Sequence, residues 1–167
     1  MIQSPVSFDQ LAERHRPELL AYLTRLLGDM HDAEDACQDT LLRAYRAFNR
    51  LKPGSNSRAW LYKIATNTAL NALKRRTRAA SRTSEANIDM LSIDSTDTFE
   101  RREQLRAVAQ AVEALPPKQR AALMLRRFQE MGYAEIAATL DCSEAAARAN
   151  VYQAVKRLRE VLADSVA

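Results

Sequence analysis

The side chains best suited to chemistry in this sequence are basic, and they are unevenly distributed along the chain. Residues 51–84 carry eight Lys or Arg side chains and no acidic one, whereas residues 85–117 carry seven acidic side chains and three basic ones. A solvated helix end explains any single one of these charges. For the whole basic block, a polyanion partner and above all nucleic acid is the better interpretation.

A second candidate site lies on one face of a helix predicted over 143–163. Its outward positions recur every fourth residue and have two small residues beside them: Glu144, Arg148, Tyr152 and Lys156, with Ala145 and Ala149. Small residues let a helix approach base edges, and Arg and Lys reach guanine or phosphate. A short helix over 133–140 and a tight turn come before it, which is the outline of a helix-turn-helix. The residues alone leave an ordinary surface helix equally open.

Catalytic and metal chemistry find no support in the residue pattern. Cys37 and Cys142 lie far apart and match no metal or redox spacing, and neither His15 nor His31 follows a Glu by three residues. A phosphate-binding glycine loop and a Ser/His/Asp set are also missing from the sequence. We therefore expect no enzyme, no cofactor and no metal.

The elements that position these side chains are predicted to be helices. The 167 residues include 29 Ala and 20 Leu but only 12 Val and Ile together, a balance that favours an all-α fold. The longest stretch without a charge, residues 64–73, is too short to cross a bilayer, and no export signal opens the chain. We expect a reduced, cytoplasmic protein without membrane insertion.

Capping and breaking residues outline the first helix. A capping box of Ser7 and Gln10 opens it, and Gly28 is a natural stop. Pro17 is expected to break or kink this helix.

The second helix is predicted to start near Asp29 or Asp32 and to bury a stripe that includes Tyr45. Ser57 is predicted to cap the third helix. The helical pattern fails over 77–98, which we interpret as a linker. Further helices are expected over 99–114, 117–130, 133–140 and 143–163, the last capped by Ser143.

Three stretches, in this order, resemble one protein family. They are DAEDACQDTLLRAYRAFNRL at 32–51, RAWLYKIATNTALNALKRR at 58–76 and LPPKQRAALMLRRFQEMGYAEIAATLDCSEAAARANVYQAVKRLRE at 115–160. They resemble the extracytoplasmic-function (ECF) sigma factors, which are small alternative sigma subunits of bacterial RNA polymerase in the sigma-70 superfamily. The likeness covers most of the chain.

The resemblance implies two small helical domains joined by a flexible acidic linker. Sigma domain 2, over 5–80, would bind core polymerase and recognise and melt the promoter −10 element. The linker would cover 81–99, and sigma domain 4, over 100–165, would read the −35 element with its helix-turn-helix. The implied function is promoter-specific transcription initiation. The implied partners are the β′ clamp helices and β flap of core polymerase, promoter DNA and an anti-sigma factor.

The family's functional positions carry over to three sets of residues. For core binding they are Asp35, Gln38, Asp39, Leu42, Arg43 and Arg46. For the −10 element they are Asn56, Ser57, Arg58, Lys63, Asn67, Asn71, Lys74, Arg75 and Arg76. For the −35 element they are Arg120, Arg127, Glu144, Ala145, Arg148, Ala149, Tyr152, Lys156 and Arg157, and Arg126 is a further candidate for a phosphate contact.

Several roles stay open within this resemblance. Trp60 is placed to stack on a base or to pack in the core, and the acidic linker either mimics nucleic acid or is a solvated tether. The sequence departs from the family at Asn71, where many members have Asp, at Asp141, where Gly is usual, and at Ala147, where a larger aliphatic residue is usual. A helix-turn-helix regulator that binds DNA without polymerase is the main rival. That reading leaves the acid-faced helix and the basic block unexplained.

Overall fold

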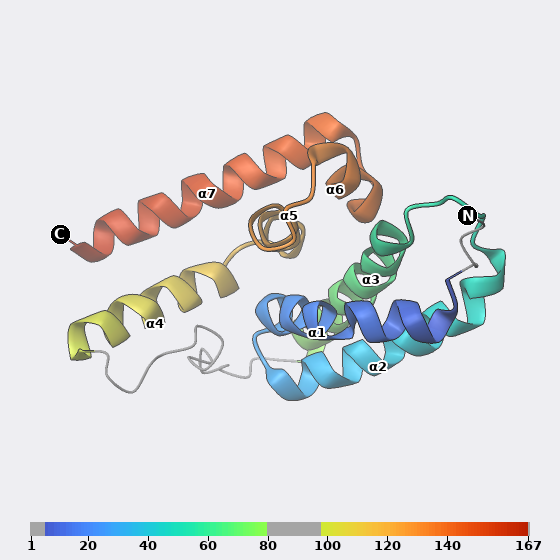
Figure 1. The fold of residues 1–167 in the computed structure, drawn as a ribbon. Coiled ribbons are helices and arrows are strands. Elements are labelled where there is room, and N and C mark those ends of the chain that lie inside the picture. The colour runs from blue at the N-terminus through green and yellow to red at the C-terminus, as the bar shows by residue number, and fades with distance from the viewer. Residues whose placement is uncertain (1–5, 80–97, 167) are drawn as a thin grey trace.

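The computed structural model describes residues 6–79 and 98–166, and all the regular structure in these ranges is helical. Residues 80–97 of the predicted linker lie outside the described residues, but its predicted ends are wrong, because residues 77–79 continue α3 and Phe99 begins α4. Figure 1 shows the arrangement of the elements, which are α1 (Phe8–Leu27), α2 (Met30–Ala47), the 3-10 turn η1 (Phe48–Arg50), α3 (Ser57–Ala79), α4 (Phe99–Glu113), α5 (Pro117–Arg127), α6 (Tyr133–Leu140) and α7 (Glu144–Val166). The predicted all-α fold is confirmed.

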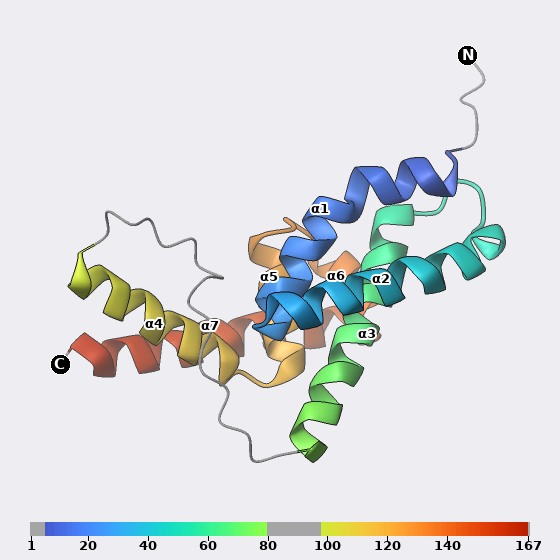
Figure 2. The same ribbon diagram turned by 90° about the horizontal axis from the view of Figure 1, so that it is seen from below.

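Local chemistry sets the ends of α1. The Ser7 hydroxyl accepts from the Gln10 N–H, and the Gln10 side chain accepts from the Ser7 N–H, so the predicted capping box is present. Gly28 ends the helix with a positive φ of 77°, which glycine adopts without strain. Of the two outcomes expected at Pro17, a break does not occur because the helix continues through it, and Figure 2 shows that α1 bends along its length.

The structure decides which residue caps α2 and corrects the predicted cap of α3. Asp29 caps α2, its carboxylate accepting from the Asp32 N–H at 2.9 Å. The predicted Ser57 cap is wrong, because the Asn56 side chain accepts from the Ala59 N–H at 3.0 Å and Ser57 is the first residue of α3. An amide oxygen serves as an N-cap as well as a hydroxyl does.

Helices α1, α2 and α3 pack around two fully buried tyrosines. The rings of Tyr22 and Tyr62 meet edge to face with centroids 5.3 Å apart, and the Tyr22 hydroxyl lies 2.7 Å from the Thr66 hydroxyl. Tyr45, predicted to lie in this core, is 64% exposed and touches Phe8 at its edge instead. Its place on α2 turns it outward, past the end of the three-helix contact.

The C-terminal helices pack around a second group of apolar side chains. Leu125, Met131, Ile136 and Ala147 are all fully buried. The small Ala147 side chain lies at the heart of the helix-turn-helix, as expected, where it leaves room for α6 and α7 to approach each other. Pro117 stands at the first position of α5, where its missing N–H costs nothing.

The two halves of the chain share one core. The buried apolar side chains of α1, α2 and α3 are continuous with those of α5, α6 and α7. Both ribbon views place α5 and α6 against α1 and α3, and the hydrogen bonds across this contact join residues 71 to 94 positions apart (Figures 1 and 2). The family resemblance did not predict this packing.

Arg120 links the two halves at this junction. Its side chain is only 7% exposed, and it donates to the Leu26 carbonyl at 2.8 Å and to the carbonyls of Glu113 and Leu115. Burial lowers the pKa of its guanidinium, and the nearby Glu113 carboxylate opposes that shift. In this packing Arg120 therefore holds backbone groups together in the interior and is not on the surface with the other predicted −35 residues.

Replacing Arg120 should make the protein easier to unfold. Arg120→Ala leaves buried carbonyls without donors, so we expect the free energy of unfolding to fall by about 3 kcal/mol in urea denaturation. Arg127→Ala, on an exposed position of the same helix, is the matched control and should change it by less than about 0.5 kcal/mol. Equal effects of the two variants would contradict this role for Arg120.

Candidate nucleic-acid interface

One face of α3 presents polar and basic side chains to solvent. The predicted −10 residues that are exposed along it are Lys63, Asn67, Asn71, Lys74 and Arg75. They occupy consecutive turns because most of them are spaced by three or four residues, while the opposite face supplies core residues. Cations on this face suit phosphates and the amides suit base edges.

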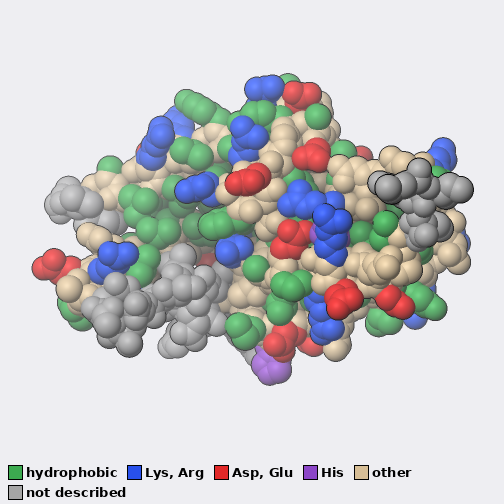
Figure 3. Space-filling model, viewed as in Figure 1, with side chains coloured by type: hydrophobic (Ala, Val, Ile, Leu, Met, Phe, Trp, Pro, Cys, Tyr) green, Lys and Arg blue, Asp and Glu red, His purple; other side chains and the backbone are tan. Residues whose placement is uncertain are grey.

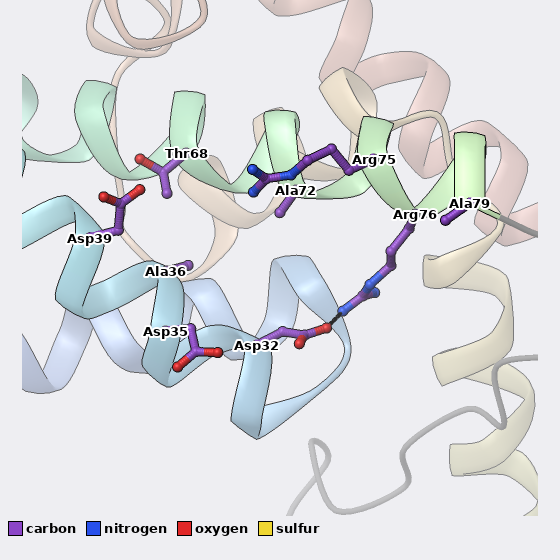
Figure 4. Close-up of a pocket in the computed structure, with 9 residues that line it drawn as sticks. All are labelled: Asp32, Asp35, Ala36, Asp39, Thr68, Ala72, Arg75, Arg76 and Ala79. Atoms are coloured by element: carbon purple, nitrogen blue, oxygen red, sulfur yellow. Dashed lines mark hydrogen bonds and ion pairs between the residues drawn. The ribbon is translucent and has the colours of Figure 1, made fainter.

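Arg76 belongs to a different environment from the rest of this set. It donates to the Leu27 carbonyl at 2.7 Å and forms an ion pair with Asp32 of α2. Figure 4 shows this pair across a pocket, with Asp35 and Asp39 on the α2 wall and Arg75 on the α3 wall. The fold thus brings residues predicted for core binding and for DNA binding to the same groove.

The side chains at the start of α3 contact the C-terminal half of the chain. The Asn56 amide donates to the Glu135 carboxylate of α6 at 2.9 Å. Arg58 donates to the Gln129 carbonyl at 3.0 Å and lies 3.4 Å from the Glu18 carboxylate. Ser57, which lies between Asn56 and Arg58 in the sequence, is half-buried. Two predicted base-contacting side chains are therefore engaged within the protein.

Gln129 is an interface residue that the sequence analysis missed. It is 6% exposed, and its side-chain oxygen accepts from the Tyr62 hydroxyl at 2.8 Å. Burial raises the pKa of Tyr62, which stays a neutral donor. The two partners lie 67 residues apart, and no local pattern in the sequence marks such a pair.

The surroundings of Trp60 favour packing in the core over stacking on a base. Its side chain is half-buried against the core, with its ring 6.5 Å from that of Phe48. A ring held in this way supports the start of α3 rather than offering a free face to a base.

The helix-turn-helix has the geometry that the sequence predicted. Asp141 adopts left-handed φ and ψ angles of 54° and 52° at the turn. The Ser143 hydroxyl accepts from the Ala146 N–H at 3.1 Å and caps α7, as expected. Figure 3 shows Lys and Arg side chains along the edge of the molecule formed by α7.

The predicted −35 residues of α7 share one open surface. All of them are exposed: Glu144, Ala145, Arg148, Ala149, Tyr152, Lys156 and Arg157. Tyr152 is 65% exposed at the middle of this surface. Arg126 and Arg127 at the end of α5 are also exposed, whereas Arg120 is not.

The predicted core-binding residues form a surface of their own on α2. Asp39 accepts from Arg43 at 3.1 Å, and both Asp35 and Gln38 are exposed beside them. Leu42 is 56% exposed within this charged surface, and Arg46 continues it by one turn. An acidic surface with one apolar side chain at its centre suits a basic protein partner.

The described residues offer neither a metal site nor a membrane-spanning helix. Residues 6–79 and 98–166 contain no group of three His, Cys, Asp or Glu side chains able to hold a metal ion. The helices in these ranges also include none that is long and apolar enough to span a membrane.

Two family models match the chain. Sigma-70 region 2 matches residues 11–79, and Sigma-70, region 4 matches residues 105–158.

Known proteins resemble the chain over nearly its whole length. The ECF RNA polymerase sigma factor SigE of Mycolicibacterium smegmatis is 31% identical over 94% of this chain, which spans 62% of that protein. The RNA polymerase sigma factor CarQ of Myxococcus xanthus is 32% identical over 95% of this chain and 90% of its own length. The solved structure of the sigma factor RpoE from Bartonella quintana, in complex with the anti-sigma factor NepR, has a TM-score of 0.75 at 27% identity and covers 93% of this chain and 96% of that one.

The turn of the helix-turn-helix allows a direct test of backbone strain. Asp141→Gly relieves the left-handed conformation, so we expect the free energy of unfolding to rise by about 0.5 kcal/mol in urea denaturation. Ala138→Gly, at an exposed position inside α6, should lower it by about 1 kcal/mol. A loss of stability in Asp141→Gly would mean that the Asp141 side chain makes a contact that stabilises the fold by more than the backbone strain destabilises it.

Proposed function

The chain belongs to the extracytoplasmic-function sigma factors of the sigma-70 family, alternative sigma factors that direct promoter-specific transcription, and we propose how its own surfaces do so. The observation that supports the proposal is the joint exposure of three surfaces on one chain: the acidic surface of α2, the basic surface of α3 and the outward surface of α7. A DNA-binding regulator that works without polymerase needs only the last of these.

The acidic surface of α2 is the proposed docking site for core polymerase. Asp35, Gln38 and Asp39 would meet basic groups of the β′ clamp helices, with Leu42 packing at the centre. Arg43 and Arg46 flank this surface and would pair with acidic groups of the partner. The C-terminal domain would contact the β flap.

The two DNA surfaces divide the promoter between them. Residues 5–80 would bind the −10 element, with Lys63, Lys74 and Arg75 on phosphates and the side chains at the start of α3 on an unstacked base. Residues 100–165 would bind the −35 element, with Arg148 in the major groove. Binding of unstacked bases offsets the cost of melting, so no catalytic step is needed.

The closed packing of the two halves leaves these DNA surfaces unequally available. The α7 surface is open, whereas Asn56 and Arg58 are held by Glu135 and Gln129. We propose that the halves separate when the −10 element binds, in the cytoplasm where polymerase works. An anti-sigma factor, such as the NepR bound to Bartonella RpoE, would act on this same equilibrium.

Run-off transcription tests the proposed function. Core polymerase with this protein and a genomic promoter library should give transcripts that core polymerase alone does not. Asp39→Arg should abolish both the transcripts and the complex with core polymerase, because it places a positive charge in the acidic surface. Glu103→Arg, a charge-matched change at an exposed position on α4, should leave both unchanged.

Two results of this assay would contradict the proposal. Stable DNA binding without any core complex would favour the regulator that acts without polymerase. Full activity of Asp39→Arg would remove α2 from the polymerase interface.

The closed packing yields a separate prediction. Gln129→Ala leaves the buried Tyr62 hydroxyl without an acceptor, which disfavours the closed form by about 1–2 kcal/mol. We expect affinity for a single-stranded −10 oligonucleotide, from a promoter found in the run-off assay, to rise by about 5- to 30-fold in fluorescence anisotropy. Affinity for the −35 duplex should stay the same, and Gln110→Ala on α4 is the control. Unchanged −10 affinity in a variant whose radius of gyration has increased would show that the packing does not compete with DNA.

A further inference from the structure

The ring of Tyr133 is held firmly at the start of α6. Its backbone begins the helix just after Gly132, whose N–H donates to the Glu135 carboxylate at 3.2 Å. The half-buried ring packs against the apolar core. A ring fixed by both a helix cap and the core is a rigid surface for anything that lies over it.

Two guanidinium groups lie over this ring. The guanidinium carbons of Arg126 and Arg148 are each 4.5 Å from the Tyr133 centroid, a distance typical of cation–π contacts. Arg126 is also anchored to the Met131 carbonyl at 3.0 Å. The α5 end, the α6 start and α7 therefore meet around one aromatic ring.

The other contact of Arg148 lies along its own helix. Its guanidinium donates to the Glu144 carboxylate at 3.0 Å, yet the Arg148 side chain remains 60% exposed. An exposed arginine with so many rotatable bonds would normally sample many positions, and binding would have to restrict them. Here a ring and a carboxylate hold the group in place while its outer edge stays open.

We infer that Tyr133 is a positioning residue for base reading, and this inference rests on the proposed role of Arg148 at the −35 element. The ring holds the guanidinium of Arg148 in the orientation that meets a base edge. Tyr133 itself touches no base.

This role affects specificity rather than general affinity for DNA. Bidentate recognition of a guanine depends on the plane of the guanidinium, whereas attraction to phosphate depends mainly on its charge. Loss of the ring should therefore weaken discrimination between bases and leave salt dependence unchanged. A purely structural role would weaken binding to every sequence alike.

The test uses the full chain and a −35 duplex from a promoter found by run-off transcription. Single base-pair changes in that duplex identify the position at which Arg148→Ala loses discrimination. Tyr133→Leu should lose discrimination at the same position by about 3- to 10-fold, and Tyr133→Phe should keep it because the ring remains. The double variant Tyr133→Leu/Arg148→Ala should be no worse than Arg148→Ala alone.

A spectroscopic measurement follows the ring contact directly. The Nε–Hε NMR signal of Arg148, identified by its disappearance in Arg148→Ala, should be shifted by the ring in the wild type and in Tyr133→Phe. That shift should vanish in Tyr133→Leu. Thermal unfolding of each variant checks that the fold persists.

Different failures of this test have different meanings. If Arg148→Ala loses discrimination and Tyr133→Leu does not, the inference is overturned and the proposed function stands. If Arg148→Ala itself discriminates normally, the proposed role of Arg148 fails, and the inference fails with it. Equal losses on specific and random DNA in Tyr133→Leu would reassign Tyr133 to a structural role.

Discussion

A buried arginine at the junction of two helical halves is the interaction on which the arrangement of this molecule depends. Arg120 satisfies carbonyl groups from α1 and from the end of α4, and it does so inside one continuous apolar core. Both terminal nitrogens of its guanidinium donate to these carbonyls, which offsets part of the cost of burying the charge, while its buried Nε–H has no partner. The relative placement of α1, α3, α5 and α6 follows from this junction, and the availability of every proposed binding surface follows from that placement.

The polar contacts that Asn56 and Arg58 make across the junction are of a kind that contacts with DNA can replace. Asn56 and Arg58 bind a carboxylate and a backbone carbonyl, which are the same acceptor chemistries that DNA offers through its base edges and phosphates. A hydrogen bond replaced by another of similar strength changes the free energy little. The apolar contacts must supply most of the closed form's stability, and a partner that covers this surface can compensate for their loss. Packing within the chain and the proposed promoter binding would thus compete for the same side chains.

The two proposed DNA surfaces differ in how far their side chains are preorganised for binding. On α7 a ring and a carboxylate hold Arg148 ready at an exposed position, while the side chains at the start of α3 are held in contacts that must first break. The proposed −35 surface is therefore preorganised in the closed form, whereas the proposed −10 surface would become available only if the two halves separate. Such an order of availability suits a protein that should not melt DNA before polymerase is present.

Local signals in the sequence determined the elements of this protein, and the fold decided how they meet. The capping box at Ser7, the turn at Asp141 and the cap at Ser143 act within a few residues, so the sequence alone predicts them and the structure confirms them. The positions proposed for polymerase and DNA contact came from motifs, and their roles stay predictions. The burial of Arg120 and the pairing of Gln129 with Tyr62 join residues from separate halves of the chain. No periodicity encodes such a contact, because it depends on how two apolar surfaces pack in three dimensions.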